Sequence, residues 1–213
     1  MNFDAVIFDL DGVIVSTDEY HYQGWKKLAD DEGIYFDHKI NERQRGVSRM
    51  ESLEILLERA EKTYSDQEKV EMAERKNNYY KELLKNLSPA DILPGVMEFT
   101  NALKDKGVKI AIGSSSKNTP AILKNIGLSD YFDAVADGNG ITHSKPDPEV
   151  FLLASKLLGI DPSRCLVVED ADAGIEAAKA GGMKALGVGV AAKNKVADYS
   201  ASDLAHITAE ELL

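Results

Sequence analysis

The sequence predicts an α/β protein, in which a Rossmann-like, doubly wound parallel sheet forms the core and carries an inserted small helical cap domain. From residue 95 onward, apolar runs typical of buried strands alternate with helical patterns, and repeated βα units of this kind form parallel sheets with helices on both faces. Between the first apolar run and that alternation lies a long stretch with only helical periodicity. We therefore expect a core of residues 1–15 and 89–213 and a cap of residues 16–88.

The elements of the core follow in order, and glycine or proline marks the end of most of them. The first apolar run is short and wholly hydrophobic, as in a strand buried on both faces. A turn-rich segment at 88–95 closes the helical insert, and a weak strand and helix finish the chain. We expect strands at 5–8, 108–112, 132–136, 165–168 and 183–188, and helices at 96–106, from about 118, at 148–158 and at 174–180.

The composition is that of a folded, acidic protein. Of the 213 residues, 44% are hydrophobic, and 25 basic residues stand against 36 acidic ones, which gives a formal net charge of −11. This balance disfavours binding to nucleic acid or to an anionic membrane, because both require a basic face. The single cysteine, Cys165, excludes an intramolecular disulfide, and neither a signal segment nor a membrane span is indicated. We expect a cytoplasmic monomer.

Polar residues follow four of the predicted strands at the point where each strand ends. Asp9 and Asp11 follow the first, the segment 114–118 follows the second, Lys145 lies in the loop after the third, and the pair at 169–170 follows the fourth. Each has an ordinary explanation alone, such as helix capping or a solvated side chain. Because the carboxyl ends of parallel strands meet at one edge of the sheet, their joint placement favours an active site there.

The residue types at this edge suit phosphate chemistry. Asp9 and the acidic pair at 169–170, with the backbone carbonyl of Asp11, offer hard oxygen ligands for one Mg²⁺ per chain. Ser114 and the amides that begin the next helix can donate to phosphate, while Lys145 can offset developing negative charge. A carboxylate held against phosphorus can act as nucleophile, which leaves Asp11 to protonate a leaving oxygen and to deprotonate an incoming hydroxyl.

These motifs together resemble those of the haloacid dehalogenase-like superfamily. The run Asp9-x-Asp11-Gly12-Val13, Ser114, Lys145 before Pro146, and Glu169-Asp170 match its four motifs, and the insert is similar to its small helical cap. The resemblance covers essentially the whole chain. It implies a phosphotransferase, and the second aspartate with the acidic fourth motif implies a phosphatase or mutase rather than a metal-free dehalogenase or an ATPase.

Further similarity lies in four segments: Glu19-Tyr20-His21 with Trp25, Arg45-Gly46-Val47-Ser48-Arg49, Arg75-Lys76-Asn77, and 114–118. Together they resemble the β-phosphoglucomutase branch of that superfamily, whose members interconvert β-glucose 1-phosphate and glucose 6-phosphate through glucose 1,6-bisphosphate. This resemblance implies that Asp9 becomes a phosphoaspartate and that Asp11 is the general acid and base. Ser114 and Lys145 would assist catalysis, and Arg49 would grip the phosphate that is not transferred. The implied metal ligands are Asp9, Asp11, Glu169 and Asp170, and the implied substrate-binding residues are His21, Trp25, Arg45, Gly46, Val47, Ser48, Arg49, Lys76, Ser115, Ser116, Lys117 and Asn118.

Alternatives to this function remain open. A sugar-phosphate phosphatase of the same fold would use the same four motifs, and a non-catalytic metabolite-binding protein could retain the fold without the reaction. His21 could equally be a structural hydrogen-bonding residue or one that orients Asp11 or the sugar. One position departs from the family pattern, because Ser16 stands before Thr17 where an aspartate is common.

Overall fold

The computed structural model describes residues 3–44 and 47–212, and the chain forms two compact units. One unit, here called the core unit, contains the chain up to Ser16 and from Ser88 onward. The other, the cap unit, is Thr17–Leu87. Within the described ranges, every helix is too short or too polar to cross a membrane.

The core unit is built on one six-stranded sheet in which all neighbouring strands are parallel, with the order β3-β2-β1-β4-β5-β6. The first strand lies in the middle, and the chain builds outward to both sides of it. This arrangement confirms the predicted doubly wound sheet. The strands are β1 (Ala5–Phe8), β2 (Lys109–Gly113), β3 (Ala134–Ala136), β4 (Cys165–Glu169), β5 (Lys184–Gly187) and β6 (Tyr199–Ser200).

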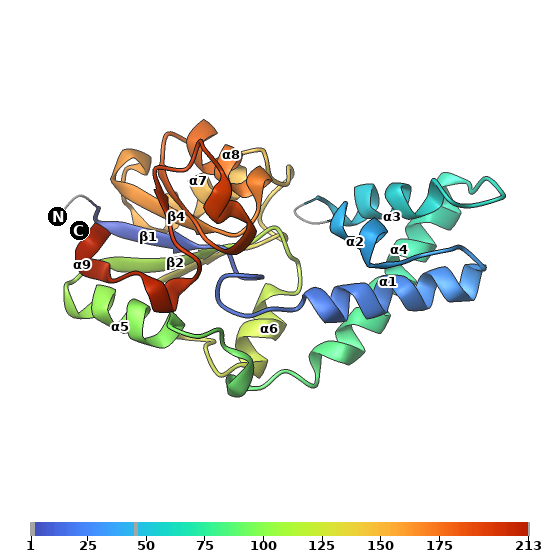
Figure 1. Cartoon of the computed structure of the whole chain (residues 1–213), viewed down its shortest axis with the longest axis horizontal. Coiled ribbons are helices and arrows are strands. Elements are labelled where there is room, and N and C mark those ends of the chain that lie inside the picture. Colours follow the sequence, from blue (N-terminus) through green and yellow to red (C-terminus); the bar gives the residue numbers. More distant parts are fainter. Residues whose placement is uncertain (1–2, 45–46, 213) are drawn as a thin grey trace. The chain divides into compact units, whose positions relative to one another are not determined.

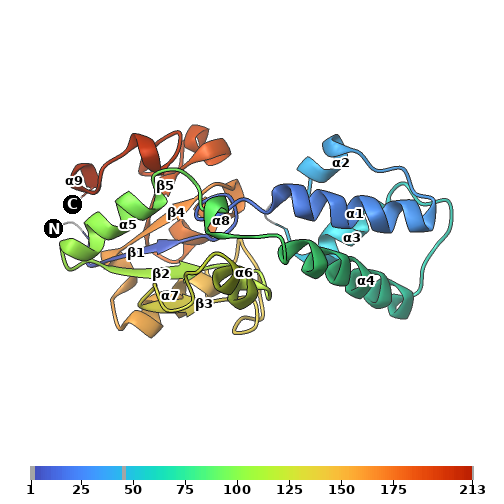
Figure 2. The same cartoon turned by 90° about the horizontal axis from the view of Figure 1, so that it is seen from below.

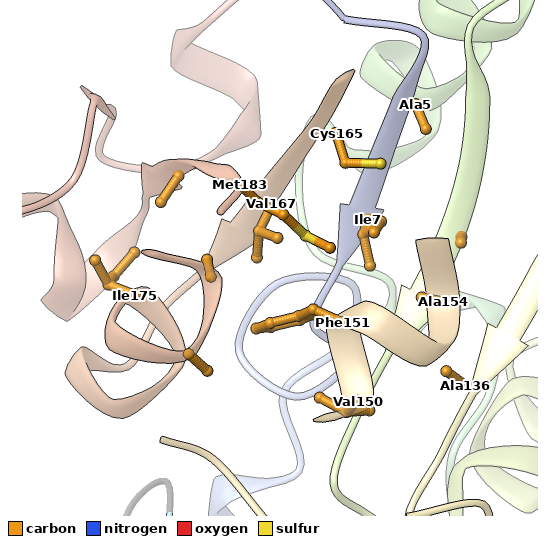
Figure 3. Close-up of a cluster of buried hydrophobic side chains, with 14 of the residues drawn as sticks. Ala5, Ile7, Ala136, Val150, Phe151, Ala154, Cys165, Val167, Ile175 and Met183 are labelled. Carbon is orange, nitrogen blue, oxygen red and sulfur yellow. The ribbon is translucent and has the colours of Figure 1, made fainter. Parts of the chain in front are cut away.

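Helices cover both faces of this sheet (Figures 1 and 2). Successive side chains of a strand point to opposite faces, so β1 contributes to two separate layers of the core. Ile7 packs with the helices α7 (Glu149–Leu158) and α8 (Asp172–Ala180), and Figure 3 shows Ile7 and Phe151 of α7 in this cluster. Phe8 lies on the other face, where its ring meets that of Phe99 at 6.2 Å between centroids. The core-unit helices are α5 (Val96–Asp105), α6 (Thr119–Asn125), α7 (Glu149–Leu158), α8 (Asp172–Ala180) and α9 (Ala209–Leu212).

Among the described residues of the cap unit, the regular secondary structure is all helical. Ser48 and Ser65 each begin a helix with a capping box, in which the serine and a glutamate three residues later satisfy each other's backbone amides. The apolar faces of the helices enclose a core of their own, which includes Trp25, Leu28 and Leu53. The cap-unit helices are α1 (Asp18–Glu32), α2 (His38–Glu42), α3 (Arg49–Leu57) and α4 (Asp66–Leu84).

Two elements of the core differ at their ends from the expectation. The strand expected at 132–136 begins only at Ala134, because the carboxylate of Asp133 accepts the Ile110 N–H at 2.9 Å, where a ladder bond would otherwise form. The helix expected from Gly174 begins at Asp172, and its first turn carries that acidic side chain, which complements the helix dipole.

Asp198 joins three parts of the core unit. It accepts hydrogen bonds from Lys179 of α8 at 2.6 Å, from Lys184 of β5 at 2.7 Å and from the Ala185 N–H at 2.9 Å. Burial alone would raise the pKa of Asp198, but the bonds to the two lysines and to the amide outweigh it and lower the pKa from 3.8 to about 2.

We predict that Asp198→Asn lowers the free energy of unfolding at pH 7 by about 1 to 2 kcal/mol, since two solvent-screened charged hydrogen bonds weaken. A carboxyl with a lowered folded-state pKa stabilises above its ordinary pKa and loses that contribution as the pH falls through the folded value. The difference from the unmodified protein should therefore be constant above about pH 5 and narrow from about pH 4 toward 2. Urea unfolding across this range measures it, and a difference independent of pH would contradict the assignment.

Candidate active site

The centre of the sheet edge is formed by the ends of β1 and β4. These strands pair in register with Phe8 opposite Val168, so the next residues along the chain, Asp9 and Glu169, leave the sheet side by side. The Asp9 N–H still donates to the Val168 carbonyl at 2.9 Å, which fixes the backbone beyond the end of β1. The sheet register therefore places two carboxylates of distant sequence position next to each other.

Lys145 bridges these two carboxylates. Its Nζ donates to Asp9 Oδ1 at 2.5 Å and to Glu169 Oε1 at 2.6 Å, and all three residues are buried. Burial alone would lower the pKa of Lys145, but the two carboxylates outweigh it and hold the pKa above its ordinary value. Burial raises the pKa of Glu169, against the attraction of Lys145. The lysine is therefore a fixed positive charge within hydrogen-bond distance of Asp9.

Two glycines make room for the acidic side chains at this edge. Gly12 has a φ of +83°, and a Cβ on it would lie 2.1 Å from Asp170 Oδ2. A Cβ on Gly174, in the first turn of α8, would lie 1.9 Å from Glu169 Oε1. Only residues without a side chain allow these carboxylates to approach so closely.

Asp9, Glu169 and Asp170 bring carboxylate oxygens within 4.8 Å of one another. Glu169 accepts from Lys145 with one oxygen and from the Ala171 N–H with the other, at 2.8 Å, yet each oxygen keeps a second lone pair. An all-oxygen donor set of this kind fits Mg²⁺. The carboxylate of Asp11 lies outside this group of ligand atoms, so the expected participation of Asp11 rests on its backbone carbonyl.

The described chain contains a second group of potential ligands, His143, Asp147 and Glu149, on the surface of the core unit. Glu149 is already engaged there, because its carboxylate accepts the backbone N–H groups of Thr142 and His143. These hydrogen bonds order the loop before α7, and they account for the position of Glu149 beside His143 without a metal ion.

The segment after β2 presents hydroxyl groups. Ser114 Oγ accepts the Ser116 N–H, and Ser116 Oγ accepts the Asn118 N–H, both at 3.2 Å. Because each hydroxyl uses a lone pair in this way, its own O–H is left to donate. The Oγ of Ser115 is buried and meets no partner in the structure, and an acceptor such as a phosphate oxygen would satisfy it. Ser114 and Asn118 are buried, whereas Lys117 is exposed.

The cap unit brings several of the expected substrate-binding residues together. Lys76 is buried, and its Nζ lies 2.8 Å from His21 Nδ1 and 4.7 Å from the centre of the Trp25 ring. Burial and the charges of Lys76 and Arg49 hold the pKa of His21 well below its usual range. His21 is therefore neutral and accepts a hydrogen bond from the lysine. Burial also lowers the pKa of Arg49, the first residue of α3.

Ser48 and Val47, which are also expected to bind substrate, have other environments. Ser48 accepts the Glu51 N–H at 3.3 Å as the cap of α3, so part of its hydrogen-bonding capacity serves the helix. Val47 is exposed. Arg45 and Gly46 lie outside the described residues.

Three supporting residues were not predicted from the sequence. Phe151 sits under the site with its ring centre 4.6 Å from Lys145 Nζ, and Gly174 makes room for Glu169. Tyr80 lies beside His21 and Lys76 in the cap unit. Only Gly174 carried a usable signal, because a glycine in the first turn of a helix often marks a close approach.

Comparison with known proteins agrees with the geometry. Residues 3–182 match the family model of haloacid dehalogenase-like hydrolases. The chain is 44% identical to β-phosphoglucomutase of Bacillus subtilis over 98% of this chain and 93% of the relative, and 33% identical to a phosphorylated carbohydrates phosphatase of Thermotoga maritima over 99% and 96%. The crystal structure of β-phosphoglucomutase from Clostridium difficile superposes with a TM-score of 0.92 at 43% identity, covering 99% of this chain and 95% of that one.

Family membership rests on both the extent of these matches and the sheet edge. The family model spans most of the chain, and two relatives exceed 30% identity along nearly all of it. The structural similarity extends over the core and the cap sequence alike. We conclude that this chain is an enzyme that belongs to the haloacid dehalogenase-like hydrolase family.

Proposed function

We propose that the protein is a magnesium-dependent phosphomutase that interconverts β-glucose 1-phosphate and glucose 6-phosphate through a phosphoaspartate and glucose 1,6-bisphosphate. One observation carries the proposal beyond the family. The chain combines a carboxylate–lysine site at the sheet edge with a separate group of cationic side chains, Lys76 and Arg49, in its cap unit. A mutase substrate carries phosphate at either end of the sugar, so it requires two anion sites. The similarity to β-phosphoglucomutases supports the same function.

The chemistry assigned to the core unit divides between two carboxylates. Phosphorylated Asp9 first passes its phosphoryl group to the 6-hydroxyl of β-glucose 1-phosphate while Asp11 takes the proton of that hydroxyl, which gives glucose 1,6-bisphosphate. Asp9, held by Lys145 at 2.5 Å, then attacks the phosphorus at position 1, and the sugar oxygen leaves with the proton from Asp11. This second step releases glucose 6-phosphate and restores the phosphoaspartate. Mg²⁺, when bound by Asp9, Asp170 and the Asp11 carbonyl, would neutralise phosphate charge. Lys145 and the Ser114 hydroxyl supply further positive charge and a hydrogen bond.

The alternative function is that of a sugar-phosphate phosphatase, and other relatives support it. The Thermotoga maritima relative and a fructose-1-phosphate phosphatase of Escherichia coli, 31% identical over 87% of this chain, are named for that activity. Both functions use the same core residues and differ in whether a sugar hydroxyl or water receives the phosphoryl group.

Product analysis separates the two functions. With β-glucose 1-phosphate, Mg²⁺ and a trace of glucose 1,6-bisphosphate, we expect glucose 6-phosphate to form and inorganic phosphate to remain minor. Rapid release of phosphate without glucose 6-phosphate would overturn the mutase proposal and favour the phosphatase.

We expect Asp9→Asn to reduce turnover by at least about 1,000-fold, because the amide cannot form the covalent intermediate. Beryllium trifluoride with Mg²⁺, an analogue of the phosphoaspartate, should bind the unmodified protein and not this variant, as ¹⁹F NMR would report. Full turnover by the variant, or equal binding of the analogue, would argue for a different nucleophile or for a non-catalytic protein.

We predict that Lys145→Met lowers the free energy of unfolding by about 3 to 5 kcal/mol in EDTA, because Asp9 and Glu169 are left buried without their counter-charge. In the double variant with Glu169→Gln, the loss should be smaller than the sum of the single losses. Lys109→Met is the control, since its ion pair with Asp133 at 2.9 Å is exposed and should contribute below about 1 kcal/mol. Additive losses in urea unfolding would contradict the coupling.

Arg49→Ala tests the second anion site. Loss of a charge-assisted contact of about 1.5 to 3 kcal/mol should lower kcat/KM for the sugar phosphate by about 10- to 150-fold. Phosphorylation of Asp9 by acetyl phosphate, which lacks a second phosphate, should stay nearly unchanged. Arg43→Ala is the control, because that arginine binds Glu58 on the cap surface at 2.7 Å. Equal losses in both assays would make Arg49 a structural residue.

A further inference from the structure

Tyr80 occupies the centre of the group of side chains that surrounds Lys76. It lies on α4, which runs beside α1 in the cap unit (Figures 1 and 2), and it is 1% exposed. Neither the four family motifs nor the proposed chemistry gives it a part. Its contacts nevertheless include two of the residues assigned to substrate binding.

The ring of Tyr80 contacts both His21 and Lys76. The His21 ring packs on it at 4.1 Å between centroids with 30° between the planes, and Lys76 Nζ lies 4.9 Å from its centre. Lys76 is one turn before Tyr80 on the same helix, so its long side chain runs along the ring toward His21 Nδ1. The ring is thus a rigid wall for a side chain that otherwise has many rotamers.

The hydroxyl of Tyr80 fixes the ring in turn. It lies 2.8 Å from Thr17 Oγ1 in a buried hydrogen bond, and Thr17 directly precedes α1, the helix that carries His21. The Thr17 carbonyl accepts the His21 N–H at 2.9 Å. One phenol therefore connects α4 to the first turn of α1 at both its ring and its oxygen.

Gly24 allows this close arrangement. A Cβ on Gly24 would lie 3.3 Å from Lys76 Cε and 3.7 Å from Tyr80 Cβ, so a small residue keeps the two helices close together. The ring and the imidazole are neutral groups, and a neutral ring attracts an ammonium without cancelling its charge.

We propose that Tyr80 is a positioning residue for the substrate site of the cap unit: its ring holds Lys76 and His21, and its hydroxyl holds the ring against Thr17. This inference rests on the proposed function, since it assumes that Lys76 meets a sugar phosphate. It predicts that the aromatic ring, rather than bulk alone, is required at position 80.

The test compares Tyr80→Leu, Tyr80→Phe and Tyr79→Leu. We expect Tyr80→Leu to lower kcat/KM for β-glucose 1-phosphate by about 10- to 100-fold, the range usual for residues that orient a ligand-binding side chain. Phosphorylation of Asp9 by acetyl phosphate should change less than about twofold. Tyr80→Phe keeps the ring and should recover most of the loss. Tyr79 is the matched control, because its hydroxyl binds Asp31 at 2.7 Å and Lys27 lies over its ring, away from this group.

A second readout follows the histidine without substrate. In ¹⁵N spectra, assigned with His21→Gln, the unmodified protein should show His21 neutral with its proton on Nε2, because Lys76 donates to Nδ1. Tyr80→Leu should give a mixture of tautomers, and Tyr80→Phe should restore the single form. The positioning role is overturned if Tyr80→Leu leaves the spectrum and kcat/KM unchanged, or if Tyr79→Leu reduces kcat/KM equally. If the unmodified protein forms no glucose 6-phosphate, only the proposed function is overturned. The ¹⁵N spectra are recorded without substrate, so they test the role of Tyr80 separately.

Discussion

The contact on which the site depends is the buried bridge from Lys145 to Asp9 and Glu169. Removing three charges from water costs free energy, and only short, well-directed bonds between opposite charges offset that cost. The sheet supplies the geometry, because β1 and β4 pair so that their last residues leave the edge side by side. The arrangement is thus a property of the whole core unit, and a shift of register by one residue would point Asp9 to the other face.

Close packing lets this charged cluster exist at the edge of an apolar core. Phe151 is fully buried, and a Cβ on Gly113 would lie 2.6 Å from its ring, so the ring fills the space at the end of β2 and supports Lys145 from below. Gly12 and Gly174, which have no side chain, leave room for the carboxylates of Asp170 and Glu169. These residues supply no charged or hydrogen-bonding side chain to the site, but their packing determines where Lys145 and the acidic side chains lie.

The sequence was sufficient to predict the sheet, its connections and the edge where polar residues gather, because apolar periodicity and strand ends are local signals. It was also sufficient to place Asp9 and Asp170 in one group of carboxylates, because both follow the ends of predicted strands. It could not show that Lys145 bonds Asp9 across 136 positions, since that contact exists only once three strands have assembled. The contacts of Tyr80 could not be predicted for a related reason. An aromatic residue on a helix usually indicates core packing, and its neighbour His21 comes from a second helix, α1.

Each unit contains a buried lysine, and the described neighbours of the two lysines differ in kind. In the core unit, carboxylates neutralise Lys145 directly, so its charge is shared before any substrate arrives. In the cap unit, the described contacts of Lys76 include the imidazole of His21 and the rings of Trp25 and Tyr80, and the faces of such rings attract an ammonium. In the proposed reaction, the first arrangement suits a group that stabilises charge developing on a phosphoryl group attached to Asp9. Under the proposed function, discrimination among sugar phosphates would come from the cap unit, because the residues at the sheet edge would serve a mutase and a phosphatase equally well.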